Sequence, residues 1–392
     1  MLLVAPTGSG GGIATGMAEE TEKLATPAPE VRDYVGALES FVAAKARARA
    51  RHDLTYLFWE CTLRCNLECR HCGSDCLRDA STKGAELPAD RVCRELSEIA
   101  RRYDAGGVTF AIIGGEPLIR RDVETVGAHA AALGYAWGVT TNAMLLKPAR
   151  LASLKAAGLR TISVSLDGLE DEHDALRRRP GAFRTVSTAI RRLVDDPFYE
   201  RFDVICCVNA LNIDGLEPFV DYLAALRVPQ VRFTPVFSRG RADANSGLML
   251  TGAQLRRLLT FVAQQRQTRS DIVVTLSEEG YWGPNWECKV RDGFHYCGSG
   301  VGIGSILHDG AVTGCPSVSR RFVEGNLAES SFLEIWERRF SRFREGRRGL
   351  AAASCGACRH WDLCEGGGCH LFDPADAAIE TCSLKRIGEY WE

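Results

Sequence analysis

Three cysteines near the start of the chain have a spacing that suits a metal cluster. Cys65, Cys69 and Cys72 form the pattern C-x₃-C-x₂-C directly after a short apolar run. Three thiolates on one loop hold a cubane iron–sulfur cluster and leave its fourth iron without a protein ligand, free to bind another molecule. Zinc motifs usually contain two C-x₂-C pairs instead. The spacing therefore favours iron–sulfur over zinc, while the flanking Cys61 and Cys76 leave the register of the triplet open.

A second set of eight cysteines lies between residues 288 and 382. Its members are Cys288, Cys297, Cys315, Cys355, Cys358, Cys364, Cys369 and Cys382. From Tyr281 onward glycine and cysteine are frequent and hydrophobic periodicity is weak. We expect metal ligation to organise this segment, because it buries too little apolar surface alone. A zinc-ribbon scaffold is the alternative. Cys206 and Cys207 stand in a predicted buried strand and are interpreted as packing residues.

Composition excludes several classes of protein. The 392 residues are 45% hydrophobic and 25% charged, with a net charge of −2, which is ordinary for a soluble globular protein and offers no footprint for nucleic acid. No apolar run approaches the roughly 20 residues of a membrane span. The N-terminus lacks the features of a secretory signal. A cytoplasmic location follows as the expectation, and cysteines there are more often metal ligands than disulfides.

Short apolar runs alternate with amphipathic stretches and predict a partial (β/α)₆ TIM-like barrel. The predicted strands are 54–59, 108–113, 136–140, 161–166, 204–208 and 231–234. The predicted helices between them are 91–102, 123–133, 148–157, 183–194 and 216–226. Six strands are fewer than the eight that close a full barrel. A helix over 251–267 and an isolated strand over 272–276 are expected to follow.

The same pattern predicts four segments. Residues 1–53 form a flexible tail and a helix, 54–240 the partial barrel, 241–280 a bridging segment, and 281–392 a small cysteine-rich domain.

Several motifs, taken in order, resemble those of the radical S-adenosylmethionine (radical SAM) superfamily. After the cysteine triplet come Gly114-Gly-Glu-Pro117, Thr141-Asn142, Ser165-Leu-Asp-Gly168 and His173–Arg177. All but the last stand at the C-terminal ends of predicted strands, the face where (β/α) barrels carry their sites. The resemblance implies that S-adenosylmethionine is bound by His71, Gly114, Gly115, Glu116, Pro117, Asn142, Ser165, Asp167 and Arg177. It implies free backbone amides at the glycine motif, and an Arg177 that meets the carboxylate of S-adenosylmethionine.

The C-terminal cysteines resemble those of the SPASM domain, which carries auxiliary clusters in radical SAM enzymes that modify peptides. Four residues rather than the usual three separate Cys364 from Cys369. The resemblance implies two auxiliary [4Fe–4S] clusters. One would use Cys288, Cys297, Cys315 and Cys369, and the other Cys355, Cys358, Cys364 and Cys382. The spacing of Cys288 to the motif varies among relatives.

The two resemblances imply a function. The reduced catalytic cluster cleaves S-adenosylmethionine to a 5′-deoxyadenosyl radical, which abstracts hydrogen from a substrate. SPASM-type relatives mostly act on ribosomally made peptides or protein side chains, with a flavodoxin or ferredoxin as electron donor. An enzyme of the haem or tetrapyrrole pathway and a non-catalytic iron–sulfur electron carrier are the alternatives. Pro316 occupies the place where sulfatase-maturing relatives have a catalytic Asp, so we expect no formylglycine formation.

Overall fold

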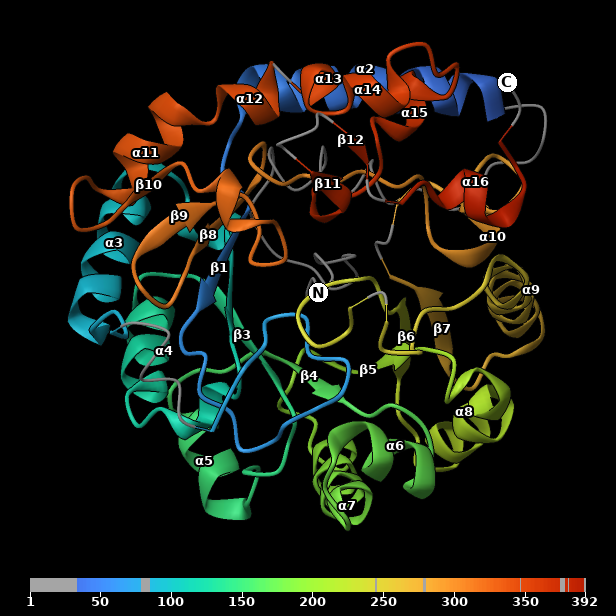
Figure 1. Cartoon of the computed structure of the whole chain (residues 1–392). Coiled ribbons are helices and arrows are strands. Elements are labelled where there is room, and N and C mark those ends of the chain that lie inside the picture. Colours follow the sequence, from blue (N-terminus) through green and yellow to red (C-terminus); the bar gives the residue numbers. More distant parts are fainter. Residues whose placement is uncertain are drawn as a thin grey trace.

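A computed structural model describes residues 34–78, 85–243, 245–277, 280–345, 347–373, 378–379 and 381–390. The predicted flexible tail lies outside the described residues. A ten-stranded sheet in the order β10-β9-β8-β1-β2-β3-β4-β5-β6-β7 forms the centre of the molecule (Figure 1). Its strands are β1 (Tyr56–Glu60), β2 (Thr109–Ile113), β3 (Ala136–Thr141), β4 (Thr161–Ser165), β5 (Arg201–Val208), β6 (Gln230–Pro235), β7 (Val273–Leu276), β8 (Ile303–Ile306), β9 (Ala311–Thr313) and β10 (Gly325–Asn326).

Helices form an arc outside the curved sheet (Figure 1). They are α3 (Ala89–Arg102), α4 (Val123–Ala132), α5 (Pro148–Ala156), α6 (Glu170–Arg177), α7 (Ala182–Val194), α8 (Leu216–Ala225) and α9 (Gly252–Thr268). Because both faces of a parallel sheet are covered, its central strands are largely buried, and β1 is buried at every position. In β1, Leu57 and Trp59 join the main core with the helices, whereas Tyr56 and Phe58 pack on the opposite, inner face.

The prediction of a partial barrel is confirmed, with three differences. The strand over 272–276 is not isolated, because β7 pairs in parallel with β6. At the other edge, β8 pairs in parallel with β1, so the sheet continues into the segment predicted as a separate domain. Helix α6 was not predicted; its eight residues contain many charged side chains and few apolar ones.

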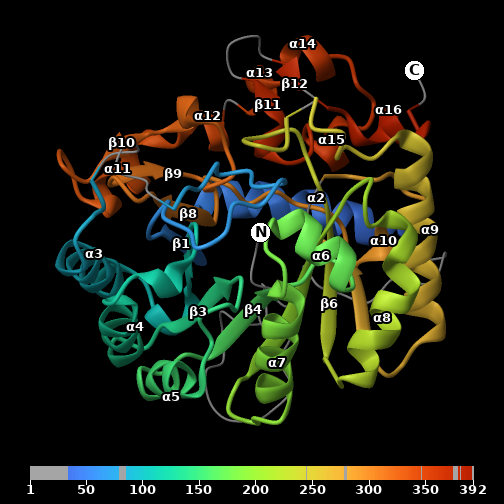
Figure 2. The same cartoon turned by 60° about the horizontal axis from the view of Figure 1, so that its bottom comes forward.

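The C-terminal part consists of short elements. They are α10 (Glu287–Val290), α11 (Phe332–Arg339), α12 (Ser341–Arg344), α13 (Arg347–Leu350), α14 (Ala352–Cys355), α15 (Trp361–Cys364), α16 (Ser383–Ile387), and the strand pair β11 (Phe372–Asp373) and β12 (Ala378–Ile379). Figure 2 shows α13 to α16 gathered on one side of the molecule, away from α3 to α5.

The N-terminal helix α2 (Tyr34–Arg51) packs against this part of the chain. Its buried Lys45 donates to the backbone carbonyl of Asp362 at 2.6 Å and forms an ion pair with Glu365 at 2.9 Å. Arg49 adds a bidentate pair to the same carboxylate, at 2.7 and 2.8 Å. The first and last described parts of the chain are therefore joined by buried charges. None of the described helices has the length and apolar character that crossing a membrane requires.

Candidate functional site

The predicted ligands of the catalytic cluster lie on the loop of residues 61–78, which follows β1. Cys65 and Cys69 are buried, Cys72 is half-buried, and the three thiols are close enough to interact electrostatically. The loop is closed by a hydrogen bond of 2.8 Å from the N–H of Cys65 to the carbonyl of Leu77. All sixteen cysteines of the chain are free thiols. The triplet is therefore available to a metal group.

The spacing of the cysteine sulfurs does not fit a single zinc ion. Tetrahedral zinc with bonds of about 2.3 Å holds its sulfurs about 3.8 Å apart. Among the described residues, one set of three or more His, Cys, Asp or Glu side chains has its donor atoms within 4.8 Å of one another, and it is His71, Asp167 and Cys207. The cysteine sets are wider than this. A cubane cluster needs such a wider spacing, because four irons rather than one lie between the sulfurs.

The glycine motif at the end of β2 packs directly against this loop. A Cβ on Gly114 would lie 2.4 Å from the carbonyl oxygen of Thr62, and one on Gly115 would lie 2.2 Å from that of Arg64. The N–H of Gly115 donates to Thr62 at 2.7 Å, and the N–H of Glu116 donates to Arg64 at 3.0 Å. The amides of Gly115 and Glu116 are therefore not free, contrary to the prediction. They hold the cluster loop in place.

The Glu116 carboxylate joins the ends of two strands. It is fully buried and accepts hydrogen bonds from Thr141 Oγ1 at 2.7 Å, the N–H of Asn142 at 2.8 Å and the N–H of Leu118 at 3.1 Å. Pro117 follows as the buried first residue of a 3₁₀ turn. Burial raises the pKa of Glu116. In this structure the carboxylate therefore positions the strand ends, and its contact with a bound cofactor stays a prediction.

Asn142 and Ser165 stand at the ends of β3 and β4. The side-chain amide of Asn142 donates to Asn66 Oδ1 at 2.7 Å and lies 3.8 Å from the sulfur of Cys65. Ser165 is half-buried and ends β4, two residues before Asp167. Both predicted residues therefore lie on the same edge of the sheet as the cluster loop.

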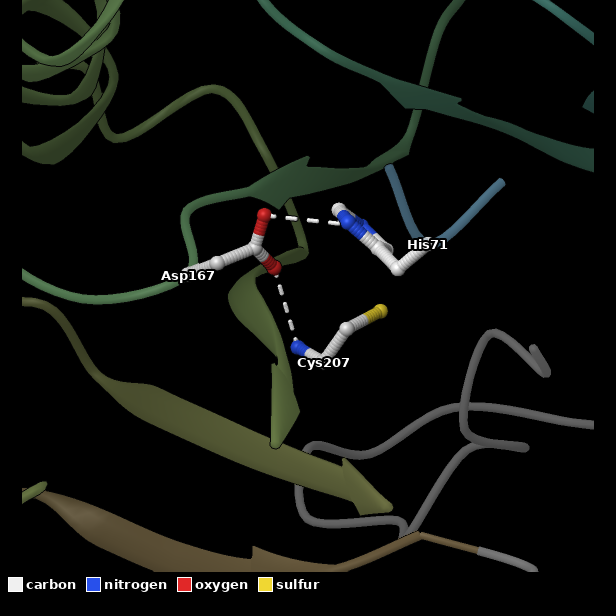
Figure 3. Close-up of side chains that lie close together, drawn as sticks. All are labelled: His71, Asp167 and Cys207. Carbon is white, nitrogen blue, oxygen red and sulfur yellow. Dashed lines mark hydrogen bonds and ion pairs between the residues drawn. The ribbon is translucent and has the colours of Figure 1, made fainter. Parts of the chain in front are cut away.

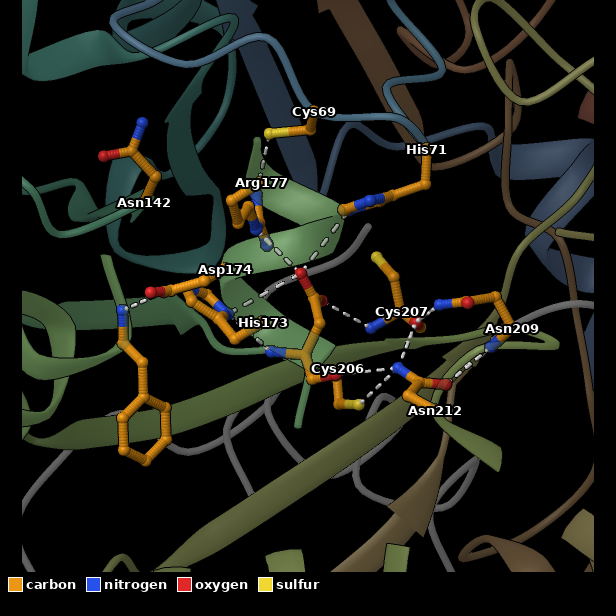
Figure 4. Close-up of polar contacts among 12 residues, drawn as sticks. Cys69, His71, Asn142, His173, Asp174, Arg177, Cys206, Cys207, Asn209 and Asn212 are labelled. Carbon is orange, nitrogen blue, oxygen red and sulfur yellow. Dashed lines mark hydrogen bonds and ion pairs between the residues drawn. The ribbon is translucent and has the colours of Figure 1, made fainter. Parts of the chain in front are cut away.

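A buried group of charged side chains lies beneath the loop (Figures 3 and 4). Arg177 Nη1 lies 3.6 Å from the sulfur of Cys69, and Arg177 Nε lies 2.7 Å from Asp167 Oδ2. Asp167 Oδ1 accepts the N–H of Cys207 at 3.0 Å, and His71 Nε2 lies 3.6 Å from Asp167 Oδ2. The structure thus brings together His71, Asp167 and Arg177, three predicted binding residues from the cluster loop, the end of β4 and α6.

This group contains a buried polar atom without a partner. His71 Nδ1 has no hydrogen-bond partner among the described residues, which is rare in folded proteins. Asp167 Oδ2 and Arg177 Nε are also buried and face each other as an ion pair at 2.7 Å. Burial lowers the pKa of His71 to about 4, so its ring is neutral. Burial opposes the ionisation of Asp167, but the charge of Arg177 lowers its pKa. A neutral ring, a carboxylate and a guanidinium fit a zwitterionic ligand with a heterocycle, as S-adenosylmethionine is.

One cysteine, Cys207, lies where the sequence did not indicate. Cys206 is buried in the main core, as predicted. Cys207 is not a packing residue, because the alternation of β5 turns it to the inner face beside His71 and Asp167 (Figure 3). Cys76 lies with the catalytic triplet, and its N–H is 3.4 Å from the sulfur of Cys72.

Sequence reasoning also missed Arg241, which follows β6. Its N–H donates to the carbonyl of Cys72 at 3.0 Å, and Nε donates to that of Cys69 at 2.8 Å. Nη1 reaches the carbonyl of Cys76 at 2.7 Å and Asp75 at 3.0 Å. Arg241 therefore fastens the cluster loop from the far side of the barrel. No spacing rule marks such a residue, since it lies about 170 positions from the carbonyls that it binds.

The C-terminal cysteines form two groups. Cys355 and Cys364 are electrostatic neighbours of each other and of both Cys358 and Cys382, so the structure brings together the four cysteines predicted for the second auxiliary set.

Cys297, Cys315 and Cys369 form the other group, in which the N–H of Cys369 lies 3.4 Å from the sulfur of Cys297. The structure does not bring Cys288 to these three. The charged groups beside Cys288 are Glu287 and Arg291. Its assignment as a ligand stays a prediction.

Comparisons with known families agree with the two parts of the site. The family model of the radical SAM superfamily matches residues 59–223, and that of the SPASM iron–sulfur cluster-binding domain matches residues 297–359. The first range contains the cysteine triplet and the residues through Arg177 that meet it. The second ends before Cys364, Cys369 and Cys382.

Relatives with curated functions include two kinds of enzyme. Mycofactocin maturase MftC of Mycolicibacterium smegmatis is 29% identical over 317 residues, which cover 79% of this chain and 77% of the relative. The AdoMet-dependent heme synthase of Methanosarcina barkeri is 27% identical over 338 residues, with 79% and 89% covered.

Solved structures share the fold. SuiB of Streptococcus suis, bound to its precursor peptide SuiA, matches with a TM-score of 0.62 and 18% identity over 84% of this chain and 76% of SuiB. The enzyme anSMEcpe with bound AdoMet and Cp18Cys peptide matches with a TM-score of 0.64 and 16% identity, over 86% and 96%.

Proposed function

Because this chain belongs to the radical SAM superfamily and carries a SPASM domain, we propose that it is a peptide maturase. Its substrate is a ribosomally made peptide or a protein side chain, from which it removes hydrogen. One observation carries this proposal. Cys65, Cys69 and Cys72 meet His71, Asp167 and Arg177 at the C-terminal edge of the parallel strands, where (β/α) barrels do their chemistry.

S-adenosylmethionine and iron–sulfur clusters are the cofactors of this enzyme. Bound together, a reduced cluster and S-adenosylmethionine supply a 5′-deoxyadenosyl radical that abstracts hydrogen. We assign the holding of the catalytic cluster to Cys65, Cys69 and Cys72. Arg177 and Asp167 offer opposite charges to the amino-acid end of the cofactor, and the neutral His71 ring packs beside it. The buried surroundings exclude water from this region, which protects a reactive radical from side reactions.

Two sets of C-terminal cysteines are assigned to auxiliary clusters. The set of Cys355, Cys358, Cys364 and Cys382 provides four thiols for one cluster. Cys297, Cys315 and Cys369 provide three for another, with Cys288 as the predicted fourth. We also assign the barrel to residues 54–240 and the SPASM domain to residues 281–392, with 241–280 between them.

The decisive experiment separates radical chemistry from the choice of substrate. The protein is reconstituted with iron and sulfide without oxygen, reduced with dithionite and incubated with S-adenosylmethionine. We expect 5′-deoxyadenosine, and its absence would favour a non-catalytic electron carrier. Short peptides encoded beside the gene are then added, and mass spectrometry records a loss of hydrogen or a new crosslink.

A second candidate is supported by one observation, the similarity to an AdoMet-dependent heme synthase. A function in heme synthesis requires a tetrapyrrole as substrate. A porphyrin precursor that binds the reconstituted enzyme, shifts its absorption band and is converted would favour it over the peptide. Mycofactocin maturase MftC is slightly more similar to this chain than the heme synthase, at 29% identity against 27%.

A further inference from the structure

An open cleft borders the cluster loop, and its lining does not include the buried residues His71, Asp167 and Arg177. Its volume is about 480 Å³. Arginine, aspartate and other polar side chains line it, among them Arg70, Arg178, Arg241, Asp75, Asp243 and Ser246. Neither the cofactor nor the substrate that we propose accounts for this cleft.

The wall of the cleft is the backbone of the cluster loop itself. Arg70 stands between Cys69 and Cys72, and its N–H donates to the carbonyl of Leu176 at 2.8 Å. A Cβ on Gly240 would lie 2.4 Å from the carbonyl oxygen of Cys72. A molecule seated in the cleft would therefore be separated from the cluster ligands by a single layer of peptide. Cys72 is also the most exposed of the three ligands.

The cleft and its rim carry positive charge without partners. Three arginines, Arg70, Arg178 and Arg179, have no side-chain hydrogen bond or ion pair among the described residues. Arg178 and Arg179 are exposed, and Arg70 is half-buried. Asp75, by contrast, is paired with Arg241 at 3.0 Å. The side chains that line the cleft carry three positive charges, from Arg70, Arg178 and Arg241, against two negative ones, from Asp75 and Asp243. Arg179, next to Arg178 in the chain, adds a further exposed cation.

The consecutive residues Arg177, Arg178 and Arg179 lie in two different environments, one buried and one exposed. Arg177 is the last residue of α6 and points inward to Cys69 and Asp167. Arg178 follows in the left-handed conformation, with φ of 51°, and ends the helix. Because the backbone turns there, Arg178 and Arg179 are presented to solvent. A side chain in the αL region is uncommon for a residue other than glycine, which indicates that its placement is held by the surrounding structure.

We propose that this cleft and its arginine rim are the docking site of an acidic electron-transfer protein of the flavodoxin or ferredoxin class. The proposal rests on the proposed function, which requires an electron donor for the catalytic cluster. One electron passes from the reduced carrier to that cluster, so the carrier is oxidised by one electron and the cluster is reduced by one, with no bond made or broken. Complementary charge raises the association rate and makes it depend on salt.

A peptide substrate is the competing occupant, and the geometry disfavours it. Hydrogen abstraction requires the substrate near the buried group of His71, Asp167 and Cys207 (Figure 4). None of these three residues lines the cleft. An electron carrier needs only proximity to the cluster ligands, which the cleft provides.

The test compares two charge-reversed variants of the reconstituted enzyme. The first is Arg178→Glu/Arg179→Glu. The control, Arg191→Glu/Arg192→Glu, reverses two exposed arginines in the last turn of α7. This turn leads into the start of β5, whereas the cluster loop lies at the C-terminal ends of the strands. Reduced flavodoxin is mixed with each enzyme, and cluster bleaching gives the second-order rate constant. We expect at least a tenfold fall for the first variant and no change for the control, with a weaker salt dependence in the first.

Three further measurements keep the outcome decisive. Reduction by dithionite and the resulting cleavage of S-adenosylmethionine should be unchanged in both variants, and this activity tests the proposed function separately. Binding of oxidised flavodoxin should weaken in the first variant whether or not its cluster loads fully. The neutral variant Arg178→Gln/Arg179→Gln should show a smaller fall in the rate constant for reduction by flavodoxin. Unchanged reduction by flavodoxin would overturn the proposal. A raised KM for the peptide under dithionite would assign the cleft to the substrate instead.

Discussion

The catalytic cysteine loop and the four-cysteine group near the C-terminus present the same ligand type in different settings. The loop of residues 61–78 is hydrogen-bonded to the end of β2, to α6 and to the segment after β6 before any metal is considered. In the second group, Cys355 and Cys364 end α14 and α15, four-residue helices that contain no buried residue. The barrel therefore prearranges its ligands, whereas we expect the C-terminal group to rely on metal for its order.

The largest effect is expected from removing the catalytic ligands. In the variant with Cys65, Cys69 and Cys72 all replaced by Ala, formation of 5′-deoxyadenosine should stop. Iron should fall by about four from a total of about twelve per chain, since each [4Fe–4S] unit carries four. The barrel should stay folded, because its sheet holds the loop. Iron analysis, circular dichroism and chromatography of the nucleoside measure the three outcomes. Continued 5′-deoxyadenosine formation would contradict the assignment.

Removal of iron should act unequally on the two regions. With a chelator under reducing conditions, we expect proteases to cut within residues 352–382, while residues 89–235 resist digestion. The reason is that few apolar side chains are buried in α14 and α15, so loss of metal leaves little to hold them. Peptide mapping by mass spectrometry before and after chelation locates the cuts. Equal sensitivity in both regions would mean that the barrel loop also depends on its cluster.

A glycine pair tests how closely the catalytic loop is held. Gly240 and Gly247 both have positive φ, 59° and 69°. A Cβ at Gly240 would meet the carbonyl of Cys72 at 2.4 Å, whereas a Cβ at Gly247 would meet nothing within 4 Å. Both Ala variants incur the backbone cost of about 1–2 kcal/mol. Only Gly240→Ala should also displace the loop and lower the iron bound there. Equal iron in the two variants would show that the loop tolerates the shift.

A smaller effect is expected where α2 meets the C-terminal part. Glu365 follows Cys364 and neutralises Lys45 and Arg49, and Arg347 Nε also lies 3.8 Å from its carboxylate. Glu365→Gln leaves a buried cation without its partner and should lower the free energy of unfolding by about 3–5 kcal/mol. The control is Asp53→Asn, which breaks an exposed pair with Arg51 and should cost less than about 1 kcal/mol. Denaturant titrations compare the two, and similar losses would contradict the role of burial.

Sequence alone predicted the barrel strands and both cysteine sets, because hydrophobic runs and ligand spacing are local features. It did not predict contacts that join distant segments. The pairing of β8 with β1 and the reach of Arg241 to the cluster loop depend on how the whole sheet curves. The inward position of Cys207 depends on the register of β5, which a run of apolar residues does not reveal. The backbone amides of the glycine motif, which we expected to be free, donate hydrogen bonds to the cluster loop. The motif alone does not reveal this contact.

The smallest expected effect is the absence of one reaction. Sulfatase maturation needs a base at the position after Cys315, and that residue is Pro316, which has no acceptor in its side chain. The carboxylate that precedes it most closely in the sequence is Asp309, but Asp309 forms an ion pair with Arg320 and accepts the N–H of Ala311 at 3.2 Å. Its pKa is low because these contacts outweigh its partial burial.

A carboxylate tied to the turn between β8 and β9 in this way is not placed to take a proton from a substrate. We therefore expect sulfatase-motif peptides with Cys or Ser to emerge without formylglycine from incubation with S-adenosylmethionine and reductant. Mass spectrometry detects the aldehyde, and 5′-deoxyadenosine in the same sample shows that the enzyme was active. Pro316→Asp is the sharper companion, because gain of aldehyde there would show that only the base was missing. Aldehyde from the unaltered chain would instead reveal a base elsewhere on the inner face, with Glu60 and its neighbour His308, 3.2 Å away, as the first pair to replace.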